Sequence, residues 1–394
     1  MSRILALIGA AALTPSALGA TLIASHFSGQ IYTLQYTGTN SSGTLAITSQ
    51  TSGCGTTPGW IEYYGDTRQL YCFDESWWGN GAITEYAVGN DGRLSITGQG
   101  RSRGNSVHGA LYGGSNGRGF VATAEYSPST ITTYRLPLNS GAAALSQTRF
   151  TLPQRGPHPR QDASHPHEIH VDPTGRFMLV PDLGADLIRI FRIDANTGAL
   201  YPCPEARADR GAGPRHVKFW KSADGQKQKV YSVNELANTV SAWDVTYPSQ
   251  WDANGCLALT RTQTLSTFAP GRSGGSMAKA AELRVVDNFL YATNRADQAF
   301  GSQQDSIATY TIDPTTGAIS WFEAANSFSY YPRTFAFNKE GTLAAIGGQT
   351  SSNVAIVQRD PVTGRLGRLI ATIQVGARGR PGEEDGLSAV VWAE

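Results

Sequence analysis

Charge is scarce in this sequence, and lysine is especially rare. Asp, Glu, Lys and Arg make up 16% of the 394 residues, against about 25% in typical soluble domains. Lysine occurs only six times in the whole chain. The 32 Lys and Arg residues nearly balance the 31 Asp and Glu residues, which leaves a net charge of +1. This balance argues against nucleic acid or another polyanion as a partner, because such binding needs a basic surface.

Long apolar runs are also missing, apart from a short one at the start of the chain. Arg3 precedes an uncharged apolar run over residues 4–13, and small residues follow up to Ala20. This pattern is typical of a secretory signal peptide. A membrane anchor is the alternative, but the run is about half as long as a spanning helix requires. We therefore expect a signal peptide at residues 1–20, no membrane span, and secretion to the extracellular space or the cell wall.

Glycine and aromatic residues, in contrast, are plentiful. Glycine accounts for 44 residues, aromatic residues for 10% and hydrophobic residues for 40% of the chain. Such a composition favours many short strands joined by tight turns over helix bundles. The expected fold class is all-β.

Four cysteines lie beyond the expected signal peptide, at Cys54, Cys72, Cys203 and Cys256. Secretion would favour disulfides between them, and four cysteines allow three pairings. We expect Cys54 to pair with Cys72 and Cys203 with Cys256, because these partners are nearest in sequence. A zinc site is disfavoured, since no two cysteines are close enough to form a typical ligand pair.

One module recurs along the chain: a strand with a polar start, a Pro/Gly turn, a second apolar strand with a polar end, and an aromatic third strand. The clearest copy has its strands at residues 167–171, 177–182 and 187–191. Four short strands per repeat are typical of a propeller blade. Turns of the type Asp-x-x-x-Gly-x-Leu/Ile are expected to join third to fourth strands, at residues 194–200, 313–319 and 360–366.

The ends of the chain supply fragments that complete one another. Residues 21–36 have strand character without a preceding first strand, and residues 387–392 are expected to form a first strand that is not followed by further strands. Together they would close the ring as a seventh blade and remove exposed sheet edges. The sequence thus predicts a single domain over residues 21–394, a seven-bladed β-propeller closed by N- and C-terminal strands sharing one blade. Six or eight blades, or two packed β domains, are the alternatives. The six internal units open at Trp60, His108, His167, Arg215, Glu282 and Arg333.

The start of a first strand and the end of a second strand meet at the same rim of a propeller channel. Four consecutive units place polar residues at both positions, so we expect a polar ring at one mouth of the channel. Arginines, a histidine and carboxylates there favour an anionic ligand and acid–base chemistry. The alternative is that the opposite charges are only structural ion pairs. The expected pairs are His167 with Asp182, Arg215 with Glu235, Glu282 with Arg295, and Arg333 with Gln349.

Other kinds of site find little support. His165 and His167 would share one face of a strand while His170 points the other way, so a metal site is not expected. No Gly-x-Ser-x-Gly elbow and no phosphate-binding loop is placed as those chemistries require. We expect neither a metal nor an organic cofactor.

These residues carry a resemblance to a known family. Residues 165–186, 213–236, 280–295 and 332–335 resemble, in order and spacing, the seven-bladed propeller lactonases. That family includes 6-phosphogluconolactonases and the 3-carboxy-cis,cis-muconate lactonizing enzyme. The resemblance implies a proposed active site at His167, Arg215, Glu235 and Arg295. The remaining polar residues of the rim are expected to contact substrate: His165, Asp182, Glu282, Arg333 and Gln349.

The resemblance further implies a small lactone or carboxylate as the substrate. We expect a monomer, because a closed propeller can exist as one. Arg215 and Arg295 would bind its anionic group and stabilise the oxyanion, while Glu235 or His167 would act as general base. The leading hypothesis is a secreted lactonase, which hydrolyses a sugar-type or anionic lactone. The alternatives are the carboxymuconate cyclase reaction and a non-catalytic extracellular propeller.

Overall fold

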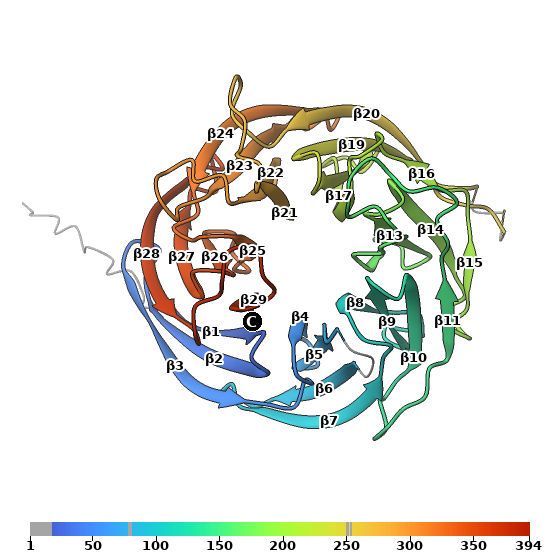
Figure 1. The fold of residues 1–394 in the computed structure, drawn as a ribbon, viewed down its shortest axis with the longest axis horizontal. Coiled ribbons are helices and arrows are strands. Elements are labelled where there is room, and N and C mark those ends of the chain that lie inside the picture. Colours follow the sequence, from blue (N-terminus) through green and yellow to red (C-terminus); the bar gives the residue numbers. More distant parts are fainter. Residues whose placement is uncertain (1–17, 78–80, 250–251, 253) are drawn as a thin grey trace, which may run out of the picture.

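A computed structural model describes residues 18–77, 81–249, 252 and 254–394 of the chain. These residues form 29 strands in seven sheets, without a helix. The sheets surround a central channel as the blades of a propeller (Figure 1), which confirms the predicted all-β fold. Of the predicted signal peptide, residues 1–17 lie outside the described residues.

We number the blades 1 to 7 in chain order, and the first strand given for each blade is the innermost. Blade 1 consists of β29 (Leu387–Trp392), β1 (Leu18–His26), β2 (Gln30–Gly38) and β3 (Gly43–Thr51). Blade 2 consists of β4 (Pro58–Tyr64), β5 (Gln69–Asp74), β6 (Ala82–Val88) and β7 (Leu94–Arg101). Blade 3 consists of β8 (Ser106–Tyr112), β9 (Phe120–Glu125), β10 (Thr130–Arg135) and β11 (Ser146–Arg149).

The next four blades follow the same order from the channel outward. Blade 4 consists of β12 (His170–Val171), β13 (Phe177–Asp182), β14 (Leu187–Ile193), β15 (Leu200–Pro202) and the short β16 (Ala206–Arg207). Blade 5 consists of β17 (Pro214–Lys221), β18 (Gln228–Asn234), β19 (Thr239–Thr246) and β20 (Ala258–Ser266). Blade 6 consists of β21 (Lys279–Val286), β22 (Phe289–Arg295), β23 (Ser306–Ile312) and β24 (Ile319–Asn326). Blade 7 consists of β25 (Pro332–Phe337), β26 (Leu343–Gly348), β27 (Asn353–Arg359) and β28 (Leu366–Gln374).

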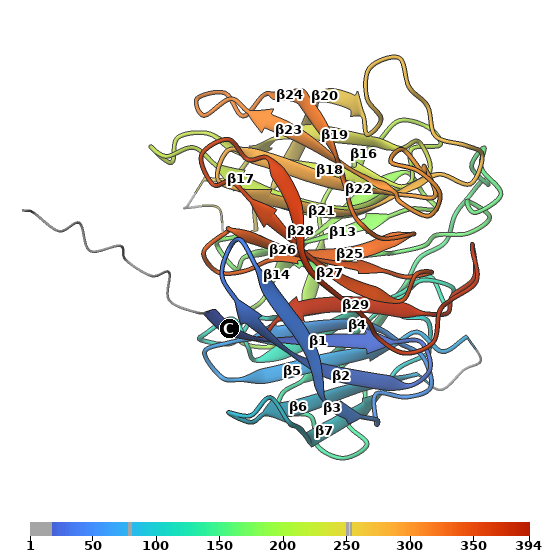
Figure 2. The ribbon, with the colours of Figure 1, turned by 90° about the vertical axis from the view of Figure 1, so that its left-hand side faces the viewer.

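Blade 1 is built from both ends of the chain, as predicted. β29 pairs antiparallel with β1, with Ile23 opposite Val391 and Ala24 opposite Val390. Figures 1 and 2 show the red strand β29 beside the blue strand β1. This pairing closes the ring, so that the innermost strands have no open edge between the first and last blades.

The hydrophobic core lies between the faces of neighbouring blades. Leu34 of blade 1, for example, packs in one buried cluster with Leu343 and Ile356 of blade 7. Burial of a side chain of this size stabilises a fold by about 1.5–3 kcal/mol. Since every blade shares such clusters with its neighbours, the channel walls form a rigid support for polar residues.

The repeated Asp-x-x-x-Gly turns join third to fourth strands, as predicted. In blade 4, Asp194 accepts hydrogen bonds from the backbone N–H groups of Asn196 and Thr197 at 2.9 and 3.2 Å. Gly198 then adopts a φ of 77°, which a residue with a side chain rarely adopts. The Tyr112 hydroxyl of blade 3 donates to the Gly198 carbonyl at 2.7 Å, so the turn also links adjacent blades.

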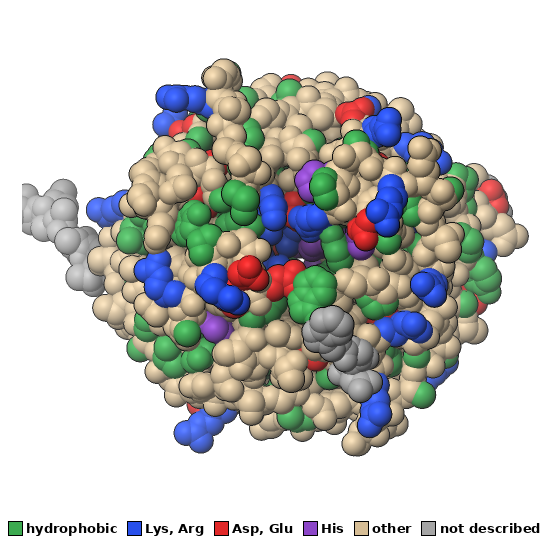
Figure 3. All heavy atoms as spheres, viewed as in Figure 1, with side chains coloured by type: hydrophobic (Ala, Val, Ile, Leu, Met, Phe, Trp, Pro, Cys, Tyr) green, Lys and Arg blue, Asp and Glu red, His purple; other side chains and the backbone are tan. Residues whose placement is uncertain are grey.

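The channel has a cavity at each end, and side chains fill its middle. Figure 3 shows the hollow at the centre of the face turned to the viewer, and we call this opening the near mouth. Further in, His108 stacks on Trp60 with ring centroids 4.6 Å apart, and it contacts His216 at 5.3 Å. These rings separate the near mouth from a second cavity, of about 460 Å³, at the far mouth.

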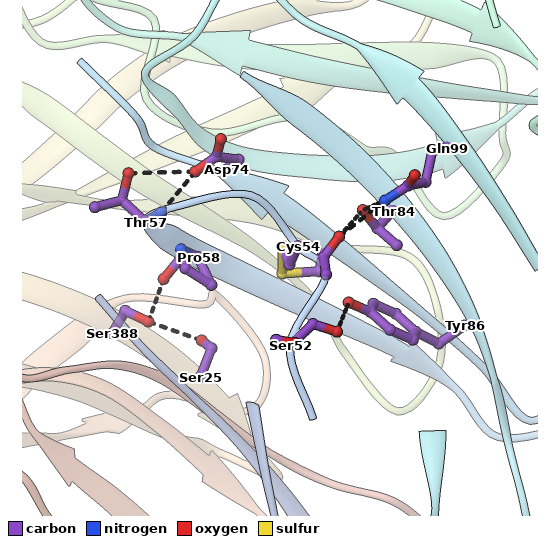
Figure 4. Close-up of a disulfide and its surroundings, with 12 residues drawn as sticks. Ser25, Ser52, Cys54, Thr57, Pro58, Asp74, Thr84, Tyr86, Gln99 and Ser388 are labelled. Atoms are coloured by element: carbon purple, nitrogen blue, oxygen red, sulfur yellow. Dashed lines mark hydrogen bonds between the residues drawn. A yellow bond between two sulfur atoms is a disulfide. The ribbon is translucent and has the colours of Figure 1, made fainter. Parts of the chain in front are cut away.

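Both predicted disulfides are confirmed. Cys54 pairs with Cys72, and Cys203 pairs with Cys256. The Cys54 bridge anchors the segment that leads into β4 (Figure 4). Next to it, Asp74 accepts a hydrogen bond from the Thr57 backbone N–H at 2.9 Å. This end of blade 2 is thereby fixed beside the channel. Within the described ranges, no helix is long and apolar enough to cross a membrane.

Candidate active site

A β-bulge in the innermost strand turns one side chain of a blade toward the near mouth. In blade 5 the register shifts between Pro214 and His216, so Arg215 is an extra residue relative to β18. Arg333 is extra in the same way in blade 7, where it follows Pro332. Bulges re-aim side chains in this manner beside many active sites, and they tolerate proline, which has no N–H for the ladder.

His167 occupies the equivalent position in blade 4. The sequence predicted a strand over residues 167–171, but β12 contains only His170 and Val171. Before it, Pro166 forms an isolated bridge with Asp182, and His167 donates its backbone N–H to the Pro181 carbonyl at 2.8 Å. The hairpin of β12 and β13 therefore already begins at Pro166, before β12. A bulge at His167 interrupts the regular hydrogen bonds between the two strands.

A second position, at the polar end of the second strand, also faces the near mouth. Arg295 is the last residue of β22, and its side chain lines the near-mouth cavity. In the other blades the position immediately follows the second strand and donates its N–H back to the segment before the innermost strand. It is occupied by Phe27, Glu75, Tyr126, Leu183, Glu235 and Gln349.

Glu235 is the centre of an arginine cluster. Its carboxylate lies 3.0 Å from Nε of Arg215 and 2.8 Å from Nη2 of Arg295, and it also accepts a hydrogen bond from Arg160. The side chain of Glu235 is only 1% exposed. Burial alone would raise the pKa of Glu235, but Arg160, Arg295 and Arg215 outweigh it and hold the pKa well below its usual range. Glu235 is therefore a permanently charged anchor for three arginines.

His167 is neutral at ordinary pH. Burial lowers its pKa well below the usual value, and the charge of Arg215 and the neighbouring His216 act in the same direction. Its ring contacts the rings of Tyr126 and His216 at centroid distances of 5.8 and 5.4 Å. Nδ1 of His167 is buried without a hydrogen-bond partner among the described residues. A neutral imidazole with a free ring nitrogen can accept a proton.

His165 is held more firmly than His167. Its ring stacks on Tyr126 at 4.0 Å, and its two ring nitrogens lie 3.0 Å from the Tyr126 carbonyl and 3.1 Å from Asp162. His165 lines the near-mouth cavity, as expected. Because both nitrogens have protein partners, this ring is suited to shaping the cavity wall.

Arg333 and Gln349 of blade 7 also line the near mouth. Arg333 donates from Nη2 to Glu75 at 2.7 Å, and Gln349 donates from Nε2 to the Glu383 carbonyl at 2.7 Å. The expected pairing of Arg333 with Gln349 is therefore replaced by separate partners for each.

Asp182 does not reach the near mouth, contrary to expectation. It is fully buried and accepts hydrogen bonds from Arg189 at 2.8 Å and from the His165 backbone N–H at 2.7 Å. The reason is its register: Asp182 is the last residue of β13, and Leu183 takes the position that Glu235 has in blade 5. Asp182 thus orders the segment that carries His165.

Glu282 is also one residue away from the expected position. The bulge of β21 contains both Ala281 and Glu282, and the fully buried Glu282 points inward along the channel. There it accepts from Arg284 at 2.7 Å and lies 3.2 Å from Nδ1 of His216. The predicted pair of Glu282 with Arg295 is therefore wrong, and Arg295 binds Glu235 instead.

The sequence did not predict several charged residues of the near mouth, among them Glu75, Arg160 and Glu384. Glu75 follows β5 as Glu235 follows β18, so the repeat itself carried a signal for it. Arg160 and Glu384 lie on connections between blades, from β11 to β12 and from β28 to β29. The repeat contains no counterpart of such connections, and hence no signal for either residue.

These side chains surround a cavity of about 650 Å³. Figure 3 shows basic side chains at one edge of the central hollow and acidic side chains at the opposite edge. The size suits a small, hydrophilic molecule. Buried polar atoms without a hydrogen-bond partner among the described residues occur on six side chains of the cavity wall: His167, Glu235, Arg295, Arg333, Gln349 and Glu384.

The described residues contain no arrangement of side chains suited to metal ligation. In the part of the chain that the structure describes, no group of three or more His, Cys, Asp or Glu side chains is arranged to hold a metal ion. His170 instead lies 3.4 Å from Glu168, deeper in the channel than His165 and His167.

Comparisons with known proteins agree with the fold. A family model described as "Lactonase, 7-bladed beta-propeller" matches residues 19–380. The probable 6-phosphogluconolactonase of Arthroderma benhamiae is 33% identical over 329 residues, which are 82% of this chain and 79% of the relative. The 6-phosphogluconolactonase of Bacillus subtilis is 26% identical over 257 residues, 65% of this chain and 67% of the relative. The structure of a periplasmic gluconolactonase of Pseudomonas aeruginosa is similar in fold, with a TM-score of 0.75, 22% identity, and coverage of 95% of this chain and 99% of that one.

Proposed function

Because the chain belongs to the seven-bladed β-propeller lactonase family, we propose that it hydrolyses the ester bond of a sugar-type or anionic lactone at the near mouth. The observation that carries this proposal is the set of cavity-lining side chains with unpartnered polar atoms. Unpartnered buried polar groups are costly in a folded protein, and a bound ligand is one way to satisfy them.

The charge and position of each side chain in the cavity indicate its role in the proposed reaction. Arg295 and Arg333 line the cavity and would bind an anionic group or stabilise the oxyanion that forms at the lactone carbonyl. Neutral His167 would accept a proton from the attacking water. Both carboxylate oxygens of Glu235 are engaged by arginines, so Glu235 serves to hold the arginines in place. Arg215 is fully buried beside Glu235 and supports the same arrangement.

The test is an acid-release assay on the purified protein with glucono-δ-lactone, its 6-phosphate and carboxymuconolactone. Wild type should release acid above the spontaneous rate. Arg295→Met should lower kcat/KM by about 100-fold or more, the usual effect of losing one donor to an oxyanion. Arg365→Met is the matched control, since Arg365 pairs with Glu323 on the outer strands. Failure of wild type to hydrolyse any of these lactones would contradict the proposal, and loss of the muconate diene instead would favour the cyclase.

We also propose that the protein is exported before it folds. Support comes from the signal-like residues 1–20 and from two disulfides, which form mainly in oxidising compartments. N-terminal sequencing of the protein from culture medium or cell wall should find a chain that starts at Ala20 or Thr21. Recovery of the uncleaved chain inside the cell would contradict export.

A further inference from the structure

One acidic side chain of the near mouth is supplied by a long connection rather than by a blade. Glu384 lies on the segment between β28 and β29, residues 375–386. Asp385 on this segment accepts from the backbone N and Nε of Arg380 at 2.7 and 2.8 Å. Gln349 donates to the Glu383 carbonyl at 2.7 Å. These contacts on both sides fix the backbone that carries Glu384 over the cavity.

Glu384 and Glu75 both line the cavity, and the charge of Glu75 is close enough to raise the pKa of Glu384. Glu75 is buried and has a partner, since Arg333 donates to it at 2.7 Å. Oε2 of Glu384, in contrast, is buried with no hydrogen-bond partner among the described residues. Two neighbouring carboxyl groups that share one cation favour a state in which only one of them is charged.

The surrounding charges decide which carboxyl keeps the proton. Burial and the charge of Glu75 raise the pKa of Glu384 to about 8, although the charges of Arg333 and Arg160 and a hydrogen bond with Trp77 act in the opposite direction. Burial also raises the pKa of Glu75, but Arg333 and Arg215 oppose it directly. At neutral pH the charge therefore belongs mainly to Glu75, and Glu384 is a hydrogen-bond donor.

We propose that Glu384 is the catalytic acid of the site, which donates its proton to the ring oxygen that leaves when the lactone opens. This role rests on the proposed lactonase function. Water loses a proton to His167 and its oxygen bonds to the carbonyl carbon. The bond between that carbon and the ring oxygen then breaks, and the ring oxygen keeps the electron pair and takes the proton of Glu384. The proton on His167 returns to Glu384 through water, which restores both groups.

The arrangement also sets the orientation of the substrate. The anionic end of the lactone lies against Arg295 and Arg160, and the ring oxygen with its neighbouring hydroxyls lies toward Glu384 and Glu75. A carboxylate such as Glu75 accepts hydrogen bonds from hydroxyls, so this side of the cavity suits a polyhydroxy lactone. A lactone without hydroxyls would lose these contacts.

The experiment compares two substrates that differ in the leaving oxygen. An alkyl lactone such as glucono-δ-lactone expels a poor leaving group that needs a proton, whereas dihydrocoumarin expels a phenolate that needs none. Glu384→Gln should lower kcat on glucono-δ-lactone by about 100-fold, within the usual range for general acid catalysis. The same variant should change kcat on dihydrocoumarin less than about threefold, because no general acid is required there. Glu323→Gln, on the outer strand β24, is the matched control.

The pH profile provides a second, independent readout. For wild type, kcat on glucono-δ-lactone should fall on the alkaline side with a midpoint near the pKa of about 8 that Glu384 has in the site. The alkaline fall should vanish in Glu384→Gln and persist in Glu384→Asp. Equal losses on both substrates, or an unchanged alkaline limb in Glu384→Gln, would overturn the role of Glu384 while the lactonase function stands. Absence of wild-type activity on both substrates would overturn the lactonase function and this role with it.

Discussion

The near mouth and the layer beneath it are built from the same strands, but their buried charged side chains are paired differently. In the deeper layer two buried carboxylates each have a base of their own: Glu282 binds Arg284 at 2.7 Å, and Glu168 binds Lys218 at 2.6 Å. At the near mouth four arginines share two carboxylates. They are Arg160, Arg215, Arg295 and Arg333, around Glu235 and Glu75.

This difference in pairing shows that one strand repeat can carry residues for stability in one layer of the channel and residues for function in another. Buried ions are tolerated when they are paired, and removal of one partner leaves a costly unpaired charge. Glu282 and Glu168 of the deeper layer are paired in this way and serve the fold. At the near mouth these four arginines outnumber the two carboxylates that pair with them among the described residues, and burial together with Arg295 lowers the pKa of Arg215 to about 9. A bound anion would relieve this repulsion.

Two histidines give the largest expected contrast between the layers. His167→Asn should lower kcat on a lactone by about 1000-fold, because it removes the proton acceptor, while the melting temperature stays nearly unchanged. His216→Asn removes a contact of Glu282 and should lower the free energy of unfolding by about 1–3 kcal/mol. Steady-state kinetics and thermal unfolding measure the two effects. If both variants lost activity and stability together, the two layers would not be functionally separate.

Glu282→Gln tests the deeper layer alone. It leaves Arg284 and His216 without their carboxylate and should lower the free energy of unfolding by about 3 kcal/mol at pH 7. Nearby Arg284 and His216 overcome the effect of burial and hold the pKa of Glu282 below its usual range.

The pH dependence of this loss has a defined sign. A carboxyl whose pKa is depressed by folding stabilises the fold above its unfolded pKa of about 4.3 and loses that contribution as the pH falls. The difference in free energy of unfolding between wild type and Glu282→Gln, measured by denaturant unfolding, should therefore be constant from pH 7 to about 5. In more acidic solution this difference should become smaller. A difference that widens in acid would contradict the pairing.

The sequence predicted the ring of blades well because each blade repeats a strand pattern that is set by burial. Its errors at the site come from register, where one residue decides the direction of a side chain. Asp182 and Glu282 were each placed one residue from the position that faces the near mouth. Asp182 is still the last residue of β13, and the bulge that contains Glu282 leaves no mark in hydrophobic periodicity. Arg160 and Glu384 lie outside the repeat altogether, so only the folded chain brings them to the cavity.

The smallest expected effect concerns the binding of an anion by the folded protein. Inorganic phosphate at about ten times its Kd should stabilise wild type by about 1.4 kcal/mol, because it binds the arginines of the folded state only. For a chain of this size the melting temperature should rise by roughly 2 °C. Arg295→Met should abolish the rise, whereas Glu282→Gln, although less stable, should show the same rise because its near mouth is intact. Sodium chloride at equal ionic strength is the control, and an equal rise in Arg295→Met would mean that phosphate binds elsewhere on the molecule.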